Sequence, residues 1–155
     1  MNIIEIEKQE AQKNVKAWLK EAEEKSDELW NKDQEEVKLF FKNSDERKAI
    51  GIISSEDMAI FDGIEDYHLY ADKSYLIDHY LNRHYDSRLF KSIQDILDNH
   101  TDIYSDLNQN SIGFVKKHGK LANCLFVKKI DNKLILFAST YKQPIIRFQN
   151  KRYKS

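Results

Sequence analysis

The period of the hydrophobic pattern changes near residue 110, and this change constrains the fold more than any other feature of the sequence. Before it, apolar residues recur at the three- and four-residue spacing of amphipathic helices. After it, short β-rich runs alternate with turn residues, with His118-Gly119 and Asp131-Asn132 at hairpin positions. Helices followed by an antiparallel meander are typical of α+β folds, in which the helices pack on one face of the sheet.

The helical part divides into an N-terminal arm and three shorter helices. Residues 5–43 lack glycine and proline and predict one long amphipathic helix or two, whose apolar stripe packs on the domain, on a partner protein or on another copy. Three further helices are predicted: a brief one from Ser54 or Ser55 to Phe61, one that begins at Asp72 or Ser74, and one over Ser87–Asn99.

The β-rich part predicts four strands, at Ile112–Lys117, Leu121–Ile130, Lys133–Thr140 and Ile145–Gln149. We therefore expect an α+β protein in which N-terminal helices are followed by a four-stranded antiparallel β-sheet. A chain of 155 residues fits one domain with appendages. The expected division is a helical extension over residues 1–48 and an α+β domain over residues 49–155.

The charges of the chain are segregated along the sequence. Residues 111–155 carry 11 Lys and Arg against one acidic residue, whereas residues 49–110 carry 4 against 12. A local excess of cations of this size attracts phosphate groups. The expected partner of the sheet is therefore an anion, with RNA as the first choice.

Several common classes of protein are excluded by what the sequence lacks. It has no glycine-rich phosphate loop, paired-cysteine zinc motif or Gly-x-Ser-x-Gly, and His79 and His84 stand five apart, which rotates them by roughly 140° around a helix. We therefore expect no metal and no cofactor. The single Cys124 suits the reducing cytoplasm, and neither a membrane span nor an apolar signal stretch in Met1–Glu10 is found, so no membrane partner is expected.

The remaining chemistry-bearing side chains suffice for metal-free cleavage of RNA. Histidine can remove the proton of a 2′-hydroxyl or protonate the leaving oxygen, while lysines stabilise the charge that develops on phosphorus. The candidate catalytic residues are His79, His84, Lys116, Lys117, Ser139, Thr140 and Tyr141. The candidate substrate-binding residues are Lys120, Lys128, Lys142 and Arg147.

Residues 49–141 resemble the phage-associated branch of the barnase/EndoU/colicin/RelE-like (BECR-fold) nucleases. The resemblance is carried by Gly51–Glu56, by Ile77–His84 as a His-x-x-x-x-His helix, by Ile93–Tyr104, and by Phe114–Lys117 and Ala138–Tyr141 as strands. It implies a toxin or phage-borne effector that cuts RNA without metal, leaves a 2′,3′-cyclic phosphate and can meet an antitoxin or immunity protein.

Two other functions fit the same sequence. One is a nucleic-acid-binding module without catalysis that uses the same basic sheet. The other is a phage structural or assembly protein that self-associates through the helices of residues 1–48. Cyclic-phosphate ends on RNA incubated with EDTA would favour the nuclease, and oligomers lost on deletion of residues 1–48 would favour the assembly protein.

Overall fold

The computed structural model describes residues 2–29, 34–106 and 111–145. Its helices are α1 (Ile3–Glu28), α2 (Gln34–Phe41), α3 (Ser55–Met58), α4 (Lys73–Asn82), α5 (Arg88–Lys91) and α6 (Ile93–Asn99). Its strands are β1 (Arg47–Ile52), β2 (His68–Asp72), β3 (Asp102–Asp106), β4 (Ser111–His118), β5 (Leu121–Ile130) and β6 (Lys133–Pro144). Among these helices, none has the length and apolar character needed to cross a membrane.

The prediction of a four-stranded antiparallel sheet is wrong, because the sheet has six strands and is mixed. The strand order is β1-β2-β6-β5-β4-β3, and β2 runs parallel to β6. The predicted meander is present as β4, β5 and β6, but β3 extends one edge and the β1–β2 hairpin joins the other. The predicted strand Ile145–Gln149 lies outside the described residues except for Ile145, which is in a turn.

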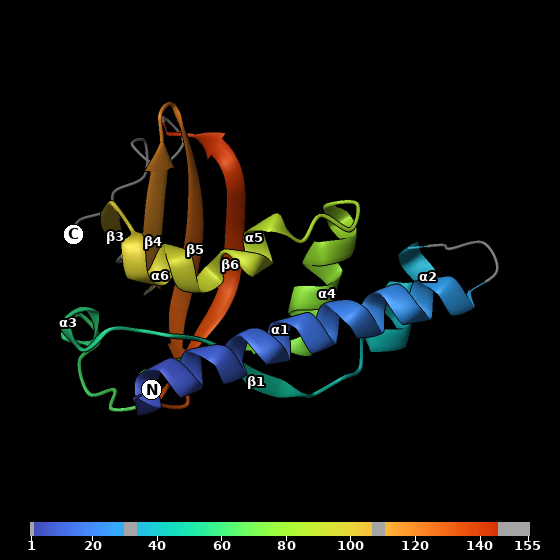
Figure 1. Ribbon diagram of the computed structural model, residues 1–155, viewed down its shortest axis with the longest axis horizontal. Coiled ribbons are helices and arrows are strands. Elements are labelled where there is room, and N and C mark those ends of the chain that lie inside the picture. The colour runs from blue at the N-terminus through green and yellow to red at the C-terminus, as the bar shows by residue number, and fades with distance from the viewer. Residues whose placement is uncertain (1, 30–33, 107–110, 146–155) are drawn as a thin grey trace.

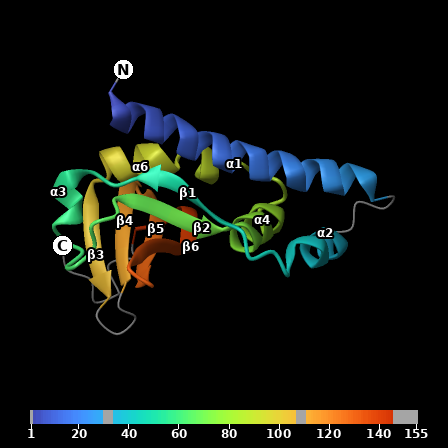
Figure 2. The ribbon, with the colours of Figure 1, turned by 90° about the horizontal axis from the view of Figure 1, so that it is seen from below.

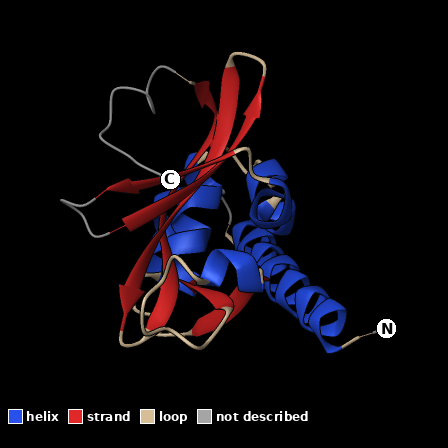
Figure 3. Cartoon of the chain, turned by 90° about the vertical axis from the view of Figure 1, so that its left-hand side faces the viewer, coloured by secondary structure: helices blue, strands red, loops and turns tan. Residues whose placement is uncertain are grey.

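The helices lie in one layer against one face of the twisted sheet (Figures 1 and 3). One hydrophobic core joins the two layers, with Tyr80, Leu81 and Ile96 from the helices and Leu125 and Leu136 from the sheet. The ends of β4, β5 and β6 extend past α5 and α6 in Figure 1. This leaves the upper part of the helix-side face of the sheet uncovered by a helix.

The arm predicted over residues 5–43 forms two helices, α1 and α2, and both pack into the common core. Trp18 and Ala22 of α1 and Val37 of α2 are buried in the same cluster as the sheet residues. Figure 2 shows α1 running along the sheet, with α2 and α4 together near its C-terminal end. Residue 48, at which the sequence suggested that the extension ends, lies within β1.

Helix α6 is seated on the edge strand β1 through the side-chain amide of Gln94. Gln94 Oε1 accepts a hydrogen bond from the Ile52 backbone N–H at 2.8 Å, and its Nε2 donates to the Ile52 carbonyl at 2.8 Å. Gly51 permits this approach, because a Cβ at that position would lie 2.6 Å from Leu97 Cδ1. The amide thus satisfies backbone groups that an edge strand would otherwise leave open to another chain.

The two predicted hairpins are confirmed. Asp131 and Asn132 have φ values of 52° and 62° and form a two-residue connection between β5 and β6. Positive φ at both positions is the requirement of a type I′ turn, which matches the twist of the paired strands. Gly119, with φ of 63°, follows β4 in the other hairpin.

We predict that Gln94→Leu destabilises the fold by about 2–4 kcal/mol, because two buried backbone groups of Ile52 lose their hydrogen bonds. Urea denaturation measures the free energy of unfolding. The control is Gln9→Leu, the same change at an exposed position of α1, for which we expect a change within about 0.5 kcal/mol. Equal effects of the two substitutions would contradict this role of Gln94.

Candidate active site

Tyr75 of α4 and Arg83, the residue that caps this helix, bond to Ser139 of β6 at the boundary between the helices and the sheet, and His79 contacts Tyr75. Tyr75, His79 and Arg83 are four residues apart, so that they share one face of the helix. The Tyr75 hydroxyl lies 3.1 Å from Ser139 Oγ, and Arg83 Nη2 donates to the Ser139 carbonyl at 2.9 Å and to Ser139 Oγ at 3.2 Å. We call these four residues the α4–β6 cluster.

His79 is held as a neutral imidazole with one nitrogen available. Its Nδ1 lies 3.0 Å from the Tyr75 carbonyl, which can only accept, so Nδ1 carries the hydrogen. Burial lowers the pKa of His79 below its ordinary value of 6.5, although the bond to Tyr75 opposes this shift. In the described part of the chain, Nε2 has no hydrogen-bond partner, so its lone pair can accept a proton from a substrate.

Arg83 is a half-buried cation that bonds only to uncharged oxygen atoms. Its guanidinium donates to the His79 carbonyl at 3.3 Å as well as to Ser139, and it lies 5.4 Å from the centre of the Phe90 ring. No carboxylate lies within ion-pairing distance of it among the residues that the structure describes. Burying a charge costs free energy unless an opposite charge compensates, so this position favours an added anion.

Tyr141 lies on β6 two residues beyond Ser139 and therefore on the same face of the strand. The Arg88 guanidinium lies 5.1 Å from the centre of its ring and the Lys142 ammonium lies 5.4 Å away. Arg88 is fixed by Asp86, and this hydrogen bonding lowers the pKa of Asp86 to about 2. An aromatic ring beside two cations is a typical arrangement for binding a base together with its phosphate.

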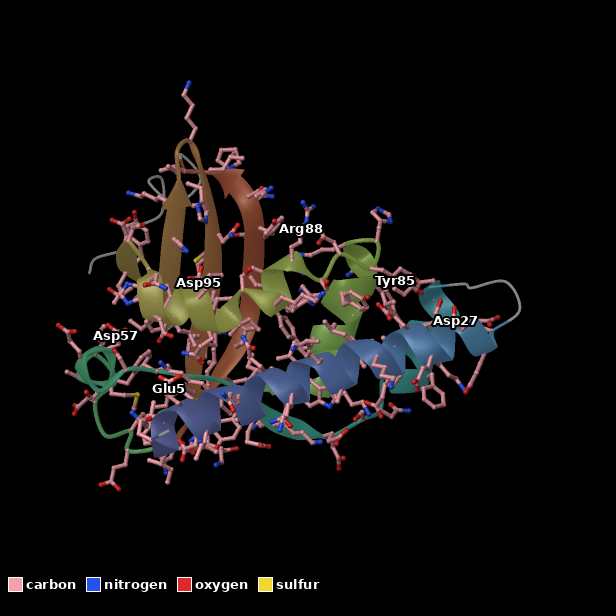
Figure 4. All side chains as sticks on the ribbon, in the orientation of Figure 1. Glu5, Asp27, Asp57, Tyr85, Arg88 and Asp95 are labelled. Carbon is pink, nitrogen blue, oxygen red and sulfur yellow. The ribbon has the colours of Figure 1, made fainter. Side chains whose placement is uncertain are left out.

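The structure distributes the other predicted catalytic residues over several places. Lys116 forms an ion pair with Asp95 of α6, which Figure 4 shows in front of the strands. Helix α6 packs on the same face of the sheet as α4, but over β4 and β5. Lys117 pairs with Asp102 at 3.0 Å. Thr140 lies opposite Cys124, whose side chain belongs to the cluster on the face away from the helices.

His84 is exposed just beyond the end of α4, with a left-handed φ of 55°. The structure thus connects His79 to Ser139 through Tyr75, whose ring lies beside that of His79 and whose hydroxyl lies beside Ser139, and Tyr141 lies along the same strand as Ser139. It does not bring Lys117 or Thr140 to that face.

The predicted substrate-binding residues also lie in different places. Lys120 is exposed in the β4–β5 turn, and Lys142 lies beside Tyr141. Lys128 lies 4.3 Å from the centre of the Phe137 ring, in the cluster on the face away from the helices. Arg147 lies outside the described residues.

Sequence reasoning missed Tyr75, Arg83 and Arg88. The four-residue spacing of Tyr75, His79 and Arg83 in a predicted helix could have indicated that the three share a face. The contact of Tyr75 and Arg83 with Ser139 could not be predicted from the sequence, because it depends on which strand lies under α4.

Two other histidines are bound to carboxylates. His68 Nδ1 lies 2.7 Å from Asp66 Oδ1, and His68 Nε2 lies 3.4 Å from Glu7 of α1. Burial raises the pKa of Asp66, but hydrogen bonds from Tyr70 and His68 outweigh it and bring the value to about 2. His100 Nε2 lies 2.9 Å from Asp57. These contacts tie α1 to β2 and α3 to the segment before β3.

No group of three His, Cys, Asp or Glu side chains that could hold a metal ion occurs within residues 2–29, 34–106 and 111–145. Comparison of the chain with protein-family models, with curated proteins and with solved structures finds no match.

We predict that the stability of the protein falls between pH 7 and pH 5 in part because of His79. Since burial lowers the pKa of folded His79 below 6.5, the unfolded chain binds this proton at a higher pH than the folded chain does. The stabilisation is therefore complete above about pH 6.5 and is lost as the pH falls through the folded pKa. Urea denaturation at several pH values should show a smaller loss for His79→Gln.

The matched control is His84→Gln, which removes an exposed imidazole from just beyond the same helix. We expect its pH dependence to follow that of the unchanged protein. A His79→Gln curve identical to that of the His84 variant would show that His79 does not couple folding to protons.

Proposed function

We propose that this protein cleaves RNA without a metal ion, with the α4–β6 cluster as the reacting site. The observation that carries the proposal is the pairing, on one face of α4, of an imidazole with an available nitrogen and an arginine without a counter-anion. When a 2′-hydroxyl attacks phosphorus, a general base removes its proton and a fixed cation stabilises the negative charge that develops.

In this reaction His79 Nε2 removes the proton of the 2′-hydroxyl, and the 2′-oxygen forms a bond to phosphorus. The bond from phosphorus to the 5′-oxygen breaks, which leaves a 2′,3′-cyclic phosphate. Arg83 stabilises the negative charge that grows on the phosphoryl oxygens. The leaving 5′-oxygen takes its proton from Tyr141, the hydroxyl on the same face of β6 as Ser139.

The charge of the sheet supports RNA as the substrate. In the described part of residues 111–145, four lysines have no carboxylate partner: Lys120, Lys128, Lys129 and Lys142. Such cations attract a polyanion whatever its sequence. As part of the same proposal, the protein acts in the cytoplasm as a toxin or phage-borne effector, and an inhibitor protein blocks its activity.

The proposal predicts that purified protein cuts RNA in the presence of EDTA and leaves cyclic-phosphate ends. His79→Ala should lower the single-turnover rate by roughly 10²–10⁴-fold, the usual effect of losing a proton-transfer group. The acid limb of the pH–rate profile should have its midpoint below 6.5, because burial lowers the pKa of His79. His84→Ala is the control and should keep the rate. A folded His79→Ala variant with the original rate would refute the assignment.

A further prediction concerns binding and uses the inactive His79→Ala protein. Lys142→Glu should weaken binding to single-stranded RNA and should reduce the slope of log affinity against log salt by about 0.7, the value for one lost phosphate contact. Fluorescence anisotropy at several salt concentrations measures both. Lys16→Glu makes the same charge change on the exposed side of α1 and serves as the control. Identical slopes for both variants would exclude Lys142 from the interface.

A further inference from the structure

A cavity of about 470 Å³ lies between α2 and α4, beside His79. Its volume is within the range of small-molecule sites. Leu39, Phe41 and Ile77 supply apolar parts of its wall, and the Tyr75 ring, 4.1 Å from the His79 ring between centres, lies next to them. The cavity therefore offers a flat group an apolar surface directly beside the proposed base.

The polar part of the wall combines carboxylates with one uncompensated cation. Glu35 and Asp78 line the cavity, and Asp78 Oδ2 accepts a hydrogen bond from Asn82 at 3.2 Å, which leaves its other oxygen for a ligand. Lys38 is bound to Glu35 and to Asn82. Lys42 is exposed and, among the side chains placed by the structure, has no carboxylate partner.

We propose that this cavity binds the base of the nucleotide next to the cleaved bond, with Lys42 contacting its phosphate. The inference rests on the proposed RNA cleavage and assigns α2, from the N-terminal arm, to substrate selection. The role of α2 follows from the position of the cavity, because residues of both α2 and α4 line it and His79 forms part of its wall.

The carboxylates also define which bases fit. Cytosine, adenine and guanine carry an exocyclic amine that donates hydrogen bonds to a carboxylate, as cytosine N4 does to Glu or Asp. Uracil has no exocyclic amine. At C4, where cytosine has its amine, it carries an acceptor oxygen that a carboxylate repels. The cavity thus selects bases with an exocyclic amine and disfavours uridine.

The experiment measures kcat and KM on poly(C), poly(A) and poly(U) with EDTA present. We expect kcat/KM on poly(C) to exceed that on poly(U) by at least about 10-fold, and Glu35→Gln to reduce this ratio. Lys42→Glu should raise KM on poly(C) by about 5-fold or more and change kcat by less than about twofold. Lys16→Glu is the matched control and should keep the original KM.

The outcomes separate the two proposals. Equal cleavage of the three polymers, together with an unchanged KM for Lys42→Glu, would overturn the base-binding role of the cavity and leave RNA cleavage intact. A failure of the unchanged protein to cut any RNA would overturn RNA cleavage itself, and the inference with it. Circular dichroism of each variant verifies that the compared proteins are folded.

Discussion

The hydrogen bonds between the Gln94 amide and the Ile52 backbone fix the helix layer to the sheet, and other contacts in the molecule depend on them. Gln94 Nε2 also donates to Asp98 at 3.1 Å, and Asp98 accepts from Lys8 of α1 at 3.2 Å. One side chain thus connects β1, α6 and α1. Because α6 is placed by this contact, its Asp95 faces Lys116 of β4 and neutralises a lysine that the sequence analysis proposed as a catalytic residue.

The α4–β6 cluster depends on a second constraint, the central position of β6. Since β6 lies between β2 and β5, it passes beneath α4, which follows β2 directly in the chain. Ser139 therefore lies within reach of Tyr75 and Arg83. The charge at this point remains uncompensated because Asp86, the nearest acid in the sequence, is occupied by Arg88. Fold topology thus sets the contacts of Arg83, and local ion pairing leaves it without an ion-pairing carboxylate among the described residues.

The sequence predicted those features that depend on local pattern. The inward set of α4, which includes Leu76 and Tyr80, is buried as expected, and the Asp131-Asn132 turn has the predicted geometry. Periodicity indicates which face of a strand is buried but not which strand is its neighbour. The parallel pairing of Leu69 with Leu134 was therefore missed, as was the pairing of Lys116 with Asp95. Both join residues too distant in sequence for local pattern to connect.

The order of strands also bears on when the two halves of the described sheet can join during synthesis of the protein. The strand β6 is the last of the described strands in the chain, yet it joins the β1–β2 hairpin to the β5–β4–β3 half of the sheet. A nascent chain still attached to the ribosome without β6 has no sheet contact between these halves, and it lacks Ser139 and Tyr141. The two halves of the described sheet are therefore joined only once β6 has left the ribosome, and the hydrogen bonds of Ser139 with Tyr75 and Arg83 form no earlier.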